Sequence, residues 1–462
     1  MSVAFSILYQ GTLVAESPLL IAQGKPEGLT GIMELRTDGS DCPVIPGTSL
    51  AGVFFEDLEW QQGKMSPSPH EHFQGLSGKL SRSREEDSRS ALIFASSPLQ
   101  AQGKSLAHWR CVRDRIRMDE ETRTVAEGAK FAQWQLITGS RFEFQLEIEP
   151  EFLNAEAREE RLQEIEQVLL RWQNHGFFLG HSSGSGNGWM RLENLQKWEV
   201  TASSYQNYLQ GDPFEMRSLF QSLSSEGVQG STRFNYLPYE VNLQPDSSAW
   251  GLDFVEIHQG SQYSLLSEMD APFYSEKYFV SEPSMNFQEY YILPGSSLRG
   301  AMRSFLRDYY PTEWIHWWFG AEKDSKQDNN ASHARRGWLR FRDARGPRVP
   351  KQSWLVHAHA EDEFTASTYE SGLFDHCPLV EAVFEGRLAY PKDFEATLIK
   401  EPGKKTEKTE AAKKAFDEAK KAFEELPKVL DFFFQQAGKR RVVLGGGGGH
   451  PSWKRTETQE AK

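Results

Sequence analysis

The chain has 462 residues, more than one hydrophobic core usually holds, so two domains of about 200 residues each are expected. Hydrophobic residues make up 38% and charged residues 25% of the sequence, which is typical of an ordinary globular protein and counts against a disordered chain. The formal net charge of −13 counts against a free-standing nucleic-acid binder, although it leaves room for a local basic groove.

The N-terminal segment, residues 1–20, alternates apolar and polar side chains as a strand does. It lacks the basic start and the cleavage site of a signal peptide, and no apolar run in the chain approaches the 18 or so residues of a membrane helix. Three scattered cysteines, Cys42, Cys111 and Cys377, favour a reducing compartment over a disulfide framework or a zinc site. These features predict a cytoplasmic protein that does not contact a membrane.

A turn that leads into a helix comes next, in the stretch CPVIPGTSLAGVFFEDLEW, residues 42–60. Pro46 and Gly47 predict a tight turn, because proline presets one backbone angle and glycine relaxes the next. The helix that follows carries several acidic residues and no arginine, so its surface offers no positive charge to an anionic partner.

The remaining elements of the first half are a strand, a helix and a loop. The alternating run FEFQLEIE, residues 142–149, predicts a half-buried strand. Apolar residues at helical spacing predict a helix over 154–176, with Gly176 as its C-cap. The stretch GHSSGSGNG, 180–188, predicts a glycine-rich loop whose backbone can approach a ligand closely.

The same order of features then recurs. The stretch VIPGTSLAG from Val44 matches ILPGSSLRG from Ile292, and the strand around Phe142 matches EAVFEGRLAYP around Phe384. Six such pairs occur in the same order with nearly constant separation, which chance matches rarely produce. The chain is therefore interpreted as a tandem duplication.

The duplication predicts a first domain at 1–200, a linker at 201–234 rich in Ser, Gly and Gln, and a second domain at 235–455. The separation jumps once, because the Lys/Glu/Ala-rich segment 400–426 has no counterpart in the first copy; its pattern predicts a solvated surface helix. The order strand, helix, strands, helix, strand in each copy predicts an α+β fold of two tandem ferredoxin-like or RRM-like domains with long insertions.

The ordered set of motifs resembles the RAMP superfamily. It consists of a strand leading through PGSSLRG into a helix, then FG, a strand of the form xLxFxDA, an acidic segment and a late glycine-rich loop. It spans nearly the whole chain, twice over, and is similar to a fusion of two backbone subunits of type III CRISPR effector complexes. The resemblance implies RRM-like domains with thumb insertions that pack on a guide crRNA. Adjacent backbone subunits and other effector subunits would be the protein partners, in antiviral defence.

Candidate RNA-binding residues lie at the two turns and the two glycine-rich loops. A helix start offers free N–H groups and a positive dipole end to a phosphate, and a serine after the second turn can cap its helix. Arg299, Arg303 and Arg307 recur at spacing four and share one helix face. The predicted RNA-binding residues are Thr48, Ser49, Ser296, Ser297, Arg299, Arg303, Gly184, Ser185, Gly186, Gly446, Gly447 and His450.

The first copy lacks those arginines, so basic residues elsewhere are expected to replace them, for example Arg82, Arg84, Arg113, Arg115 or Arg117. Aromatic residues beside the loops or in the expected thumb are candidates for stacking on bases. They are Trp189, Trp453, Tyr274 and Phe279.

The resemblance also implies that catalytic members cleave the paired target RNA with Mg²⁺ or Mn²⁺. Asp270, followed by Ala271 and Pro272, resembles the family's catalytic Asp-x-Pro. A carboxylate there could bind the metal or help activate the 2′-hydroxyl of the target, and Glu268 and Glu276 are nearby alternatives. The first copy has no Asp-x-Pro, so we expect it not to cleave.

Two other functions stay open from the sequence. The first is a structural RNA-binding subunit without catalysis. The second is a guide-maturation ribonuclease, which would need a histidine-based acid–base pair near a glycine-rich loop. His181 and His450 are the candidates for that pair.

Overall fold

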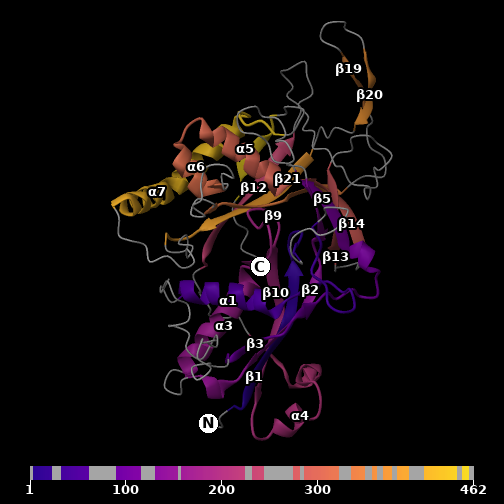
Figure 1. The fold of residues 1–462 in the computed structure, drawn as a ribbon, viewed down its shortest axis with the longest axis vertical. Coiled ribbons are helices and arrows are strands. Elements are labelled where there is room, and N and C mark those ends of the chain that lie inside the picture. Colours follow the sequence, from indigo (N-terminus) through magenta and orange to yellow (C-terminus); the bar gives the residue numbers. More distant parts are fainter. Residues whose placement is uncertain are drawn as a thin grey trace.

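The computed structural model describes residues 4–22, 33–61, 90–115, 131–153, 158–223, 232–243, 274–280, 286–321, 335–348, 356–361, 368–376, 382–394, 410–444 and 450–456. The two largest sheets belong one to each repeat (Figure 1). The first repeat, indigo to magenta, occupies the lower half with α1 and α3, and the second, orange to yellow, occupies the upper half with α5, α6 and α7.

The first repeat is an antiparallel sheet in the order β10-β1-β7-β3, with one helix after its first strand and one after its third. This strand order is that of a ferredoxin-like fold. The elements are β1 (Ser6–Ala15), α1 (Gly47–Gln61), β3 (Leu92–Phe94), β7 (Arg141–Ile148), α3 (Arg158–Asn174) and β10 (Trp189–Val200).

The second repeat has the same plan. Its sheet runs β18-β21-β12-β22, with β17 also paired to β21. The elements are β12 (Phe234–Leu243), α5 (Gly295–Arg307), α6 (Thr312–Phe319), β17 (Arg340–Arg342), β18 (Ala344–Arg348), β21 (Ala382–Pro391), α7 (Glu410–Gly438) and β22 (Ser452–Arg455). The predicted α+β fold with two ferredoxin-like repeats is confirmed.

Insertions decorate both sheets as hairpins and short strands. In the second repeat β13 and β14 extend the sheet beyond β18, and β9 of the first repeat joins the second sheet. The insertion elements are β2 (Val44–Ile45), β4 (Ser97–Pro98), β5 (Arg110–Arg115), β6 (Phe131–Leu136), β8 (Phe177–Phe178), β9 (Ser185–Gly186), β13 (Ser275–Val280), β14 (Asn286–Leu293), β15 (Gly320–Ala321), β16 (Arg335–Arg336), β19 (Val356–Glu361) and β20 (Thr368–His376).

The core of the first repeat follows from the alternation in β7. Phe142, Phe144 and Leu146 are fully buried, because every second side chain of a strand points to the same face of the sheet. Trp172 of α3 packs edge-on against Phe144, with ring centroids 6.4 Å apart. The strand and the helix predicted here are thus joined into one core, and Gly176, with φ 76°, follows the end of α3 as predicted.

The Lys/Glu/Ala-rich insertion is not a separate surface helix. It continues without a break into the equivalent of α3, so that α7 runs from Glu410 to Gly438. Ala422 and Leu426, inside the predicted insertion, are fully buried, and the main-chain oxygen of Ala422 accepts a hydrogen bond from Trp318 Nε1 at 3.0 Å. The prediction of a fully solvated helix is wrong because α6 packs against this part of α7.

The segment after the first sheet carries structure of its own. Residues 201–223, inside the predicted linker, contain α4 (Tyr205–Leu209) and β11 (Gln221–Ser222), which pairs with β10. Phe220 is buried against Leu8 and Trp198. This segment therefore covers part of the first sheet.

Candidate nucleic-acid interface

The turn before α5 is capped by a residue that is distant in sequence. Pro294 occupies the N-cap position without a side-chain cap, so the predicted capping by Ser296 or Ser297 is wrong. Instead, the amide of Gly295 donates a 2.6 Å hydrogen bond to Asp343 Oδ1. A carboxylate from the second sheet thus already compensates the positive end of this helix.

The four hydroxyl candidates lie in the first turns of α1 and α5. Thr48 is exposed, and Ser49, Ser296 and Ser297 are partly exposed. Hydroxyl groups at such positions can contact phosphate oxygens. Their role in binding RNA stays a prediction.

The arginines of α5 are partly buried and are engaged by the protein itself. Arg299 donates to the main-chain oxygen of Phe319, at the end of α6. Arg303 and Arg307 are also partly buried, and both interact with other residues. This face of α5 is therefore partly exposed and partly packed against the protein. That Arg299 or Arg303 binds RNA stays a prediction.

The glycine-rich loop of the first repeat docks on the second repeat. Ser185 and Gly186 form β9, which pairs in parallel with Phe341 and Arg342 of β17. A Cβ at Gly186, which has a φ of 105°, would lie 2.1 Å from Asp343 Oδ1, and a Cβ at Gly295 would lie 2.8 Å from Gly186 Cα. Two features predicted separately to bind RNA, the loop of one repeat and the turn of the other, therefore meet.

The other residues of the predicted loops are placed only in part. Gly184 is half-buried, and its main-chain oxygen accepts a 3.4 Å hydrogen bond from the amide of Phe341. His450, just before β22, is exposed, and Gly446 and Gly447 lie outside the described residues. In this loop Gly186, and not Gly184, is needed for the close approach of the two repeats.

A buried ionic cluster stabilises the junction, the contact region between the two repeats. Arg113 of β5 binds Asp343 at 2.7 Å and Glu276 of β13, with Arg113 Nε 2.9 Å from Glu276 Oε1. Tyr274 donates its hydroxyl to Glu276 at 2.6 Å, and Arg113 reaches Asn187 at 3.4 Å. The Arg113 side chain is 2% exposed, so the first repeat supplies the cation that two buried acids of the second repeat need.

The pKa values in the cluster follow from one cation facing two acids. Burial lowers the pKa of Arg113, but the attraction of Asp343 and Glu276 outweighs it, so the pKa stands well above its usual value. Burial raises the pKa of Glu276, and Asp343 adds to that shift while Arg113 opposes it. The guanidinium therefore stays charged at all working pH values.

Two predicted roles are corrected by this cluster. Arg113 cannot bind RNA at the surface, because it is buried and paired across the junction. Glu276 is wrong as an alternative catalytic acid, because it is 6% exposed and its oxygen is taken by Arg113 and Tyr274. Sequence reasoning had no means of pairing residues so far apart along the chain.

The aromatic candidates for base stacking are also buried. Their exposed fractions are too small for a base to reach their ring faces: Trp189 3%, Trp453 1%, Tyr274 7% and Phe279 6%. Phe279, on hairpin β13–β14 of the second repeat, packs into the core of the first, 4.7 Å from the ring of Trp109. The stacking predictions for these four residues are wrong.

The acidic face of α1 also serves the junction. Arg233, just before β12, binds Glu56 at 2.5 Å and Asp57 at 3.1 Å. Asp57 also accepts a 2.8 Å hydrogen bond from Trp172 Nε1. The missing arginines in the first copy are thus explained by a partner arginine supplied by the second.

The catalytic candidates are not placed. Asp270 and Glu268 lie outside the described residues. In the part of the chain that the structure describes, no three His, Cys, Asp or Glu side chains gather in a way that could hold a metal ion. His181 and His450 are both exposed, one in each repeat.

Comparison with known protein families agrees with the repeat structure. The RAMP superfamily matches residues 12–191 and 280–447, one region in each repeat, and the chain belongs to that superfamily. No curated protein matches the chain. RAMP proteins work in CRISPR RNA–protein complexes, and membership indicates a CRISPR-associated RNA-binding subunit. Within the described ranges no helix is long and apolar enough to cross a membrane.

Proposed function

We propose that the chain is a fused pair of backbone subunits of a type III CRISPR effector complex that binds a guide crRNA and the target RNA paired with it. The observation that carries the proposal is the meeting of Gly186 with Gly295, which joins the loop of one RAMP repeat to the turn of the next. Such head-to-tail contact makes one continuous surface from two repeats. Adjacent backbone subunits would extend it in the cytoplasm.

RNA would be held by shape and phosphate rather than by base sequence. The exposed Thr48 and the partly exposed Ser296 and Ser297 offer hydroxyls at two equivalent helix starts, and α5 adds arginines. A net charge of −13 is compatible with this role, because basic residues need only line the RNA path while the remaining surface meets protein partners.

Cleavage of the target is assigned to the second repeat. Asp270 of the Asp-x-Pro sequence would bind Mg²⁺ or Mn²⁺, or help activate the attacking 2′-hydroxyl. This part rests on the sequence resemblance alone, since the residue lies outside the described ranges. The first repeat would bind RNA without cutting it.

The test is reconstitution of the full complex with a guide RNA and an end-labelled target, in Mg²⁺ or Mn²⁺. Wild type should cut the target at several positions, and Asp270→Ala should lose one of these cuts while binding the target equally well. Glu268→Ala tests the alternative acid two residues away, and it should keep the full pattern if Asp270 is the catalytic residue. An unchanged pattern with Asp270→Ala removes the catalytic assignment and leaves a structural RNA-binding subunit. Failure to bind the guide contradicts the proposal as a whole.

A further inference from the structure

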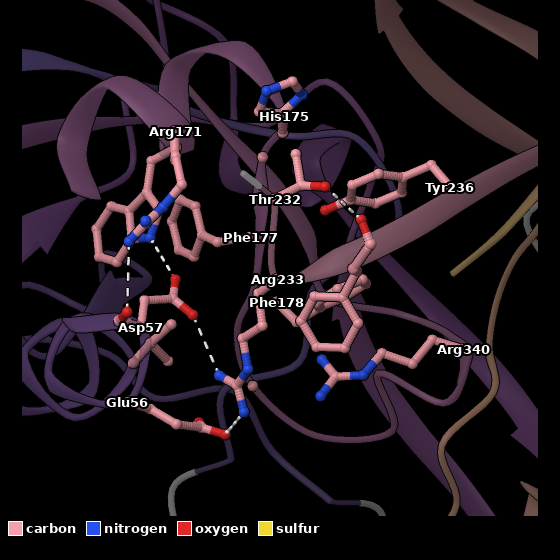
Figure 2. Close-up of a pocket in the computed structure, with 15 residues that line it drawn as sticks. Glu56, Asp57, Arg171, His175, Phe177, Phe178, Thr232, Arg233, Tyr236 and Arg340 are labelled. Atoms are coloured by element: carbon pink, nitrogen blue, oxygen red, sulfur yellow. Dashed lines mark hydrogen bonds and ion pairs between the residues drawn. The ribbon is translucent and has the colours of Figure 1, made fainter. Parts of the chain in front are cut away.

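A cavity of about 120 Å³ lies between the two repeats and is lined by residues of both (Figure 2). Its walls are α1, the end of α3 and the loop after it in the first repeat, and the starts of β12 and β17 in the second. A cavity of about 150 Å³ holds a benzene molecule. The occupant of this one is therefore a single small group and not a whole nucleotide.

The side chains that line the cavity include more arginines than carboxylates. Three arginines, Arg171, Arg233 and Arg340, face two carboxylates, Glu56 and Asp57. Both carboxylates form ion pairs with Arg233, at 2.5 Å and 3.1 Å. Arg171 instead donates to the main-chain oxygen of Asp57 at 3.3 Å, which is a neutral acceptor.

Arg340 is held in a fixed orientation. The carbon at the centre of its guanidinium lies 4.1 Å from the ring centre of Phe178 and 4.4 Å from that of Phe234. Aromatic rings stack on the flat faces of a guanidinium, so the N–H donors remain along its edge. Figure 2 shows Arg171 and Arg340 on opposite sides of the cavity, with Arg233 between them.

Two further residues indicate what the cavity favours. The pKa of His175 is lowered by burial and then by three nearby cations, Arg387, Arg191 and Arg171, so the potential at this wall is positive. Burial raises the pKa of the Tyr236 phenol, which keeps the hydroxyl protonated and able to donate. The cations beside His175 favour an anion in this space over a cation.

We propose that this cavity binds a phosphate group. Arg171 and Arg340 would approach it from opposite sides, with the Tyr236 hydroxyl as a neutral donor. Guanidinium donors match a tetrahedral oxyanion with paired, charge-assisted hydrogen bonds. Glu56 and Asp57 are both paired with Arg233, which offsets part of their repulsion of the anion. The proposal does not depend on the RNA-guided role, since free phosphate and the end of an RNA carry the same chemistry.

The experiment is calorimetric titration of the full chain with inorganic phosphate, in chloride buffer of constant ionic strength. We expect one saturable site in the millimolar range or tighter. Arg171→Gln and Arg340→Gln should each weaken it by about tenfold, the effect of one lost charge-assisted bond, and Arg171→Lys should recover part of the loss. Arg455→Gln removes an exposed arginine from β22 and should leave the affinity unchanged.

Val53→Glu places a carboxylate in the wall without removing an arginine, and it should abolish binding even if Arg340→Gln fails to fold. A short RNA with a 5′-phosphate, compared with the same RNA ending in a hydroxyl, separates the sources. If the RNA with a 5′-phosphate displaces inorganic phosphate and the RNA ending in a hydroxyl does not, an RNA end is the ligand. If phosphate binds and neither RNA displaces it, free phosphate is the ligand. No saturable phosphate binding, or equal affinity in Arg171→Gln, Val53→Glu and Arg455→Gln, overturns the proposal.

Discussion

The helices α1 and α5 begin with the same turn, yet they meet different neighbours. In both repeats the turn glycine lies against the main-chain oxygen of a phenylalanine in its own sheet: a Cβ at Gly47 would come within 2.1 Å of the Phe94 oxygen, and one at Gly295 within 2.9 Å of the Phe341 oxygen. Only Gly295 also touches Gly186, from the other repeat. In both repeats the turn therefore packs against its own sheet. In the second repeat it also contacts the glycine-rich loop of the first repeat.

The charges of the two helices follow the same difference. The acidic face of α1 binds Arg233 of the second repeat, whereas Arg299 of α5 binds the end of α6 in its own repeat. The absence of arginine from α1 is thus no evidence that the first repeat has lost a function. The acidic residues of α1 are there because this face of the helix contacts the second repeat.

Arg113 is where the junction can be broken most severely. Arg113→Met leaves Glu276 and Asp343 buried without their cation, which costs about 3–5 kcal/mol. Urea unfolding should show this loss as a lower midpoint. Arg455→Met on β22 removes an exposed pair with Asp431 of α7 and should cost less than about 1 kcal/mol. Similar losses in the two variants would mean that the buried cluster does not hold the repeats together.

Gly186 tests the close approach of the two repeats. Gly186→Ala places a Cβ 2.1 Å from Asp343 Oδ1 at a φ of 105°, and strain plus displacement should cost about 2–4 kcal/mol. Gly184→Ala, in the same loop, meets its nearest atom at 3.8 Å and is the matched control. Denaturant midpoints of the two variants should differ clearly, and equal midpoints would contradict the docking of β9 on β17.

A pH effect of one proton is expected from His175, at the wall of the cavity. Burial and then Arg387, Arg191 and Arg171 depress its pKa below the ordinary 6.5. As the pH falls through 6.5, the unfolded chain takes up this proton and the folded chain does not, so stability decreases until the folded pKa is reached. His175→Gln should flatten the dependence of unfolding free energy on pH in this window. An unaltered slope would show that His175 titrates normally in the folded protein.

The smallest effect is expected at a single RNA contact on α5. Arg303→Gln should weaken binding of guide RNA several-fold and lower the slope of log affinity against log salt by about 0.7, the value for one phosphate on a single strand. Filter binding at several salt concentrations measures both. Arg455→Gln serves as the control for a lost charge away from α5. A salt slope equal to that of wild type would remove Arg303 from the RNA path.

The sequence predicted the repeated fold well because its signals are local. The alternation around Phe142 and Phe144, the helical spacing before Gly176 and the recurrence of the Pro-Gly turn each depend on a few neighbouring residues. These patterns are set by strand and helix geometry, which the chain carries within a short window. Helix ends were less certain, as the fusion of the insertion into α7 shows.

The junction could not be predicted in the same way. The cap of α5 comes from Asp343 and not from the adjacent serines, and Arg113 finds its partners in the other repeat. One signal was available: Asp343 ends the FRD run of a buried strand, and an acid in that place needs a partner. Which arginine supplies it depends on how the two sheets meet, and no local pattern contains that information.

Hairpin β13–β14 has a consequence for the newly made chain. Phe279 completes the core around Trp109, and its amide bonds to the oxygen of Thr138 at 2.9 Å, although the ribosome adds it long after the last strand of the first sheet. N-terminal domains usually fold as soon as they emerge. The contact of Trp109 with Phe279 can form only after synthesis has reached the second repeat, so the core of the first repeat is completed late.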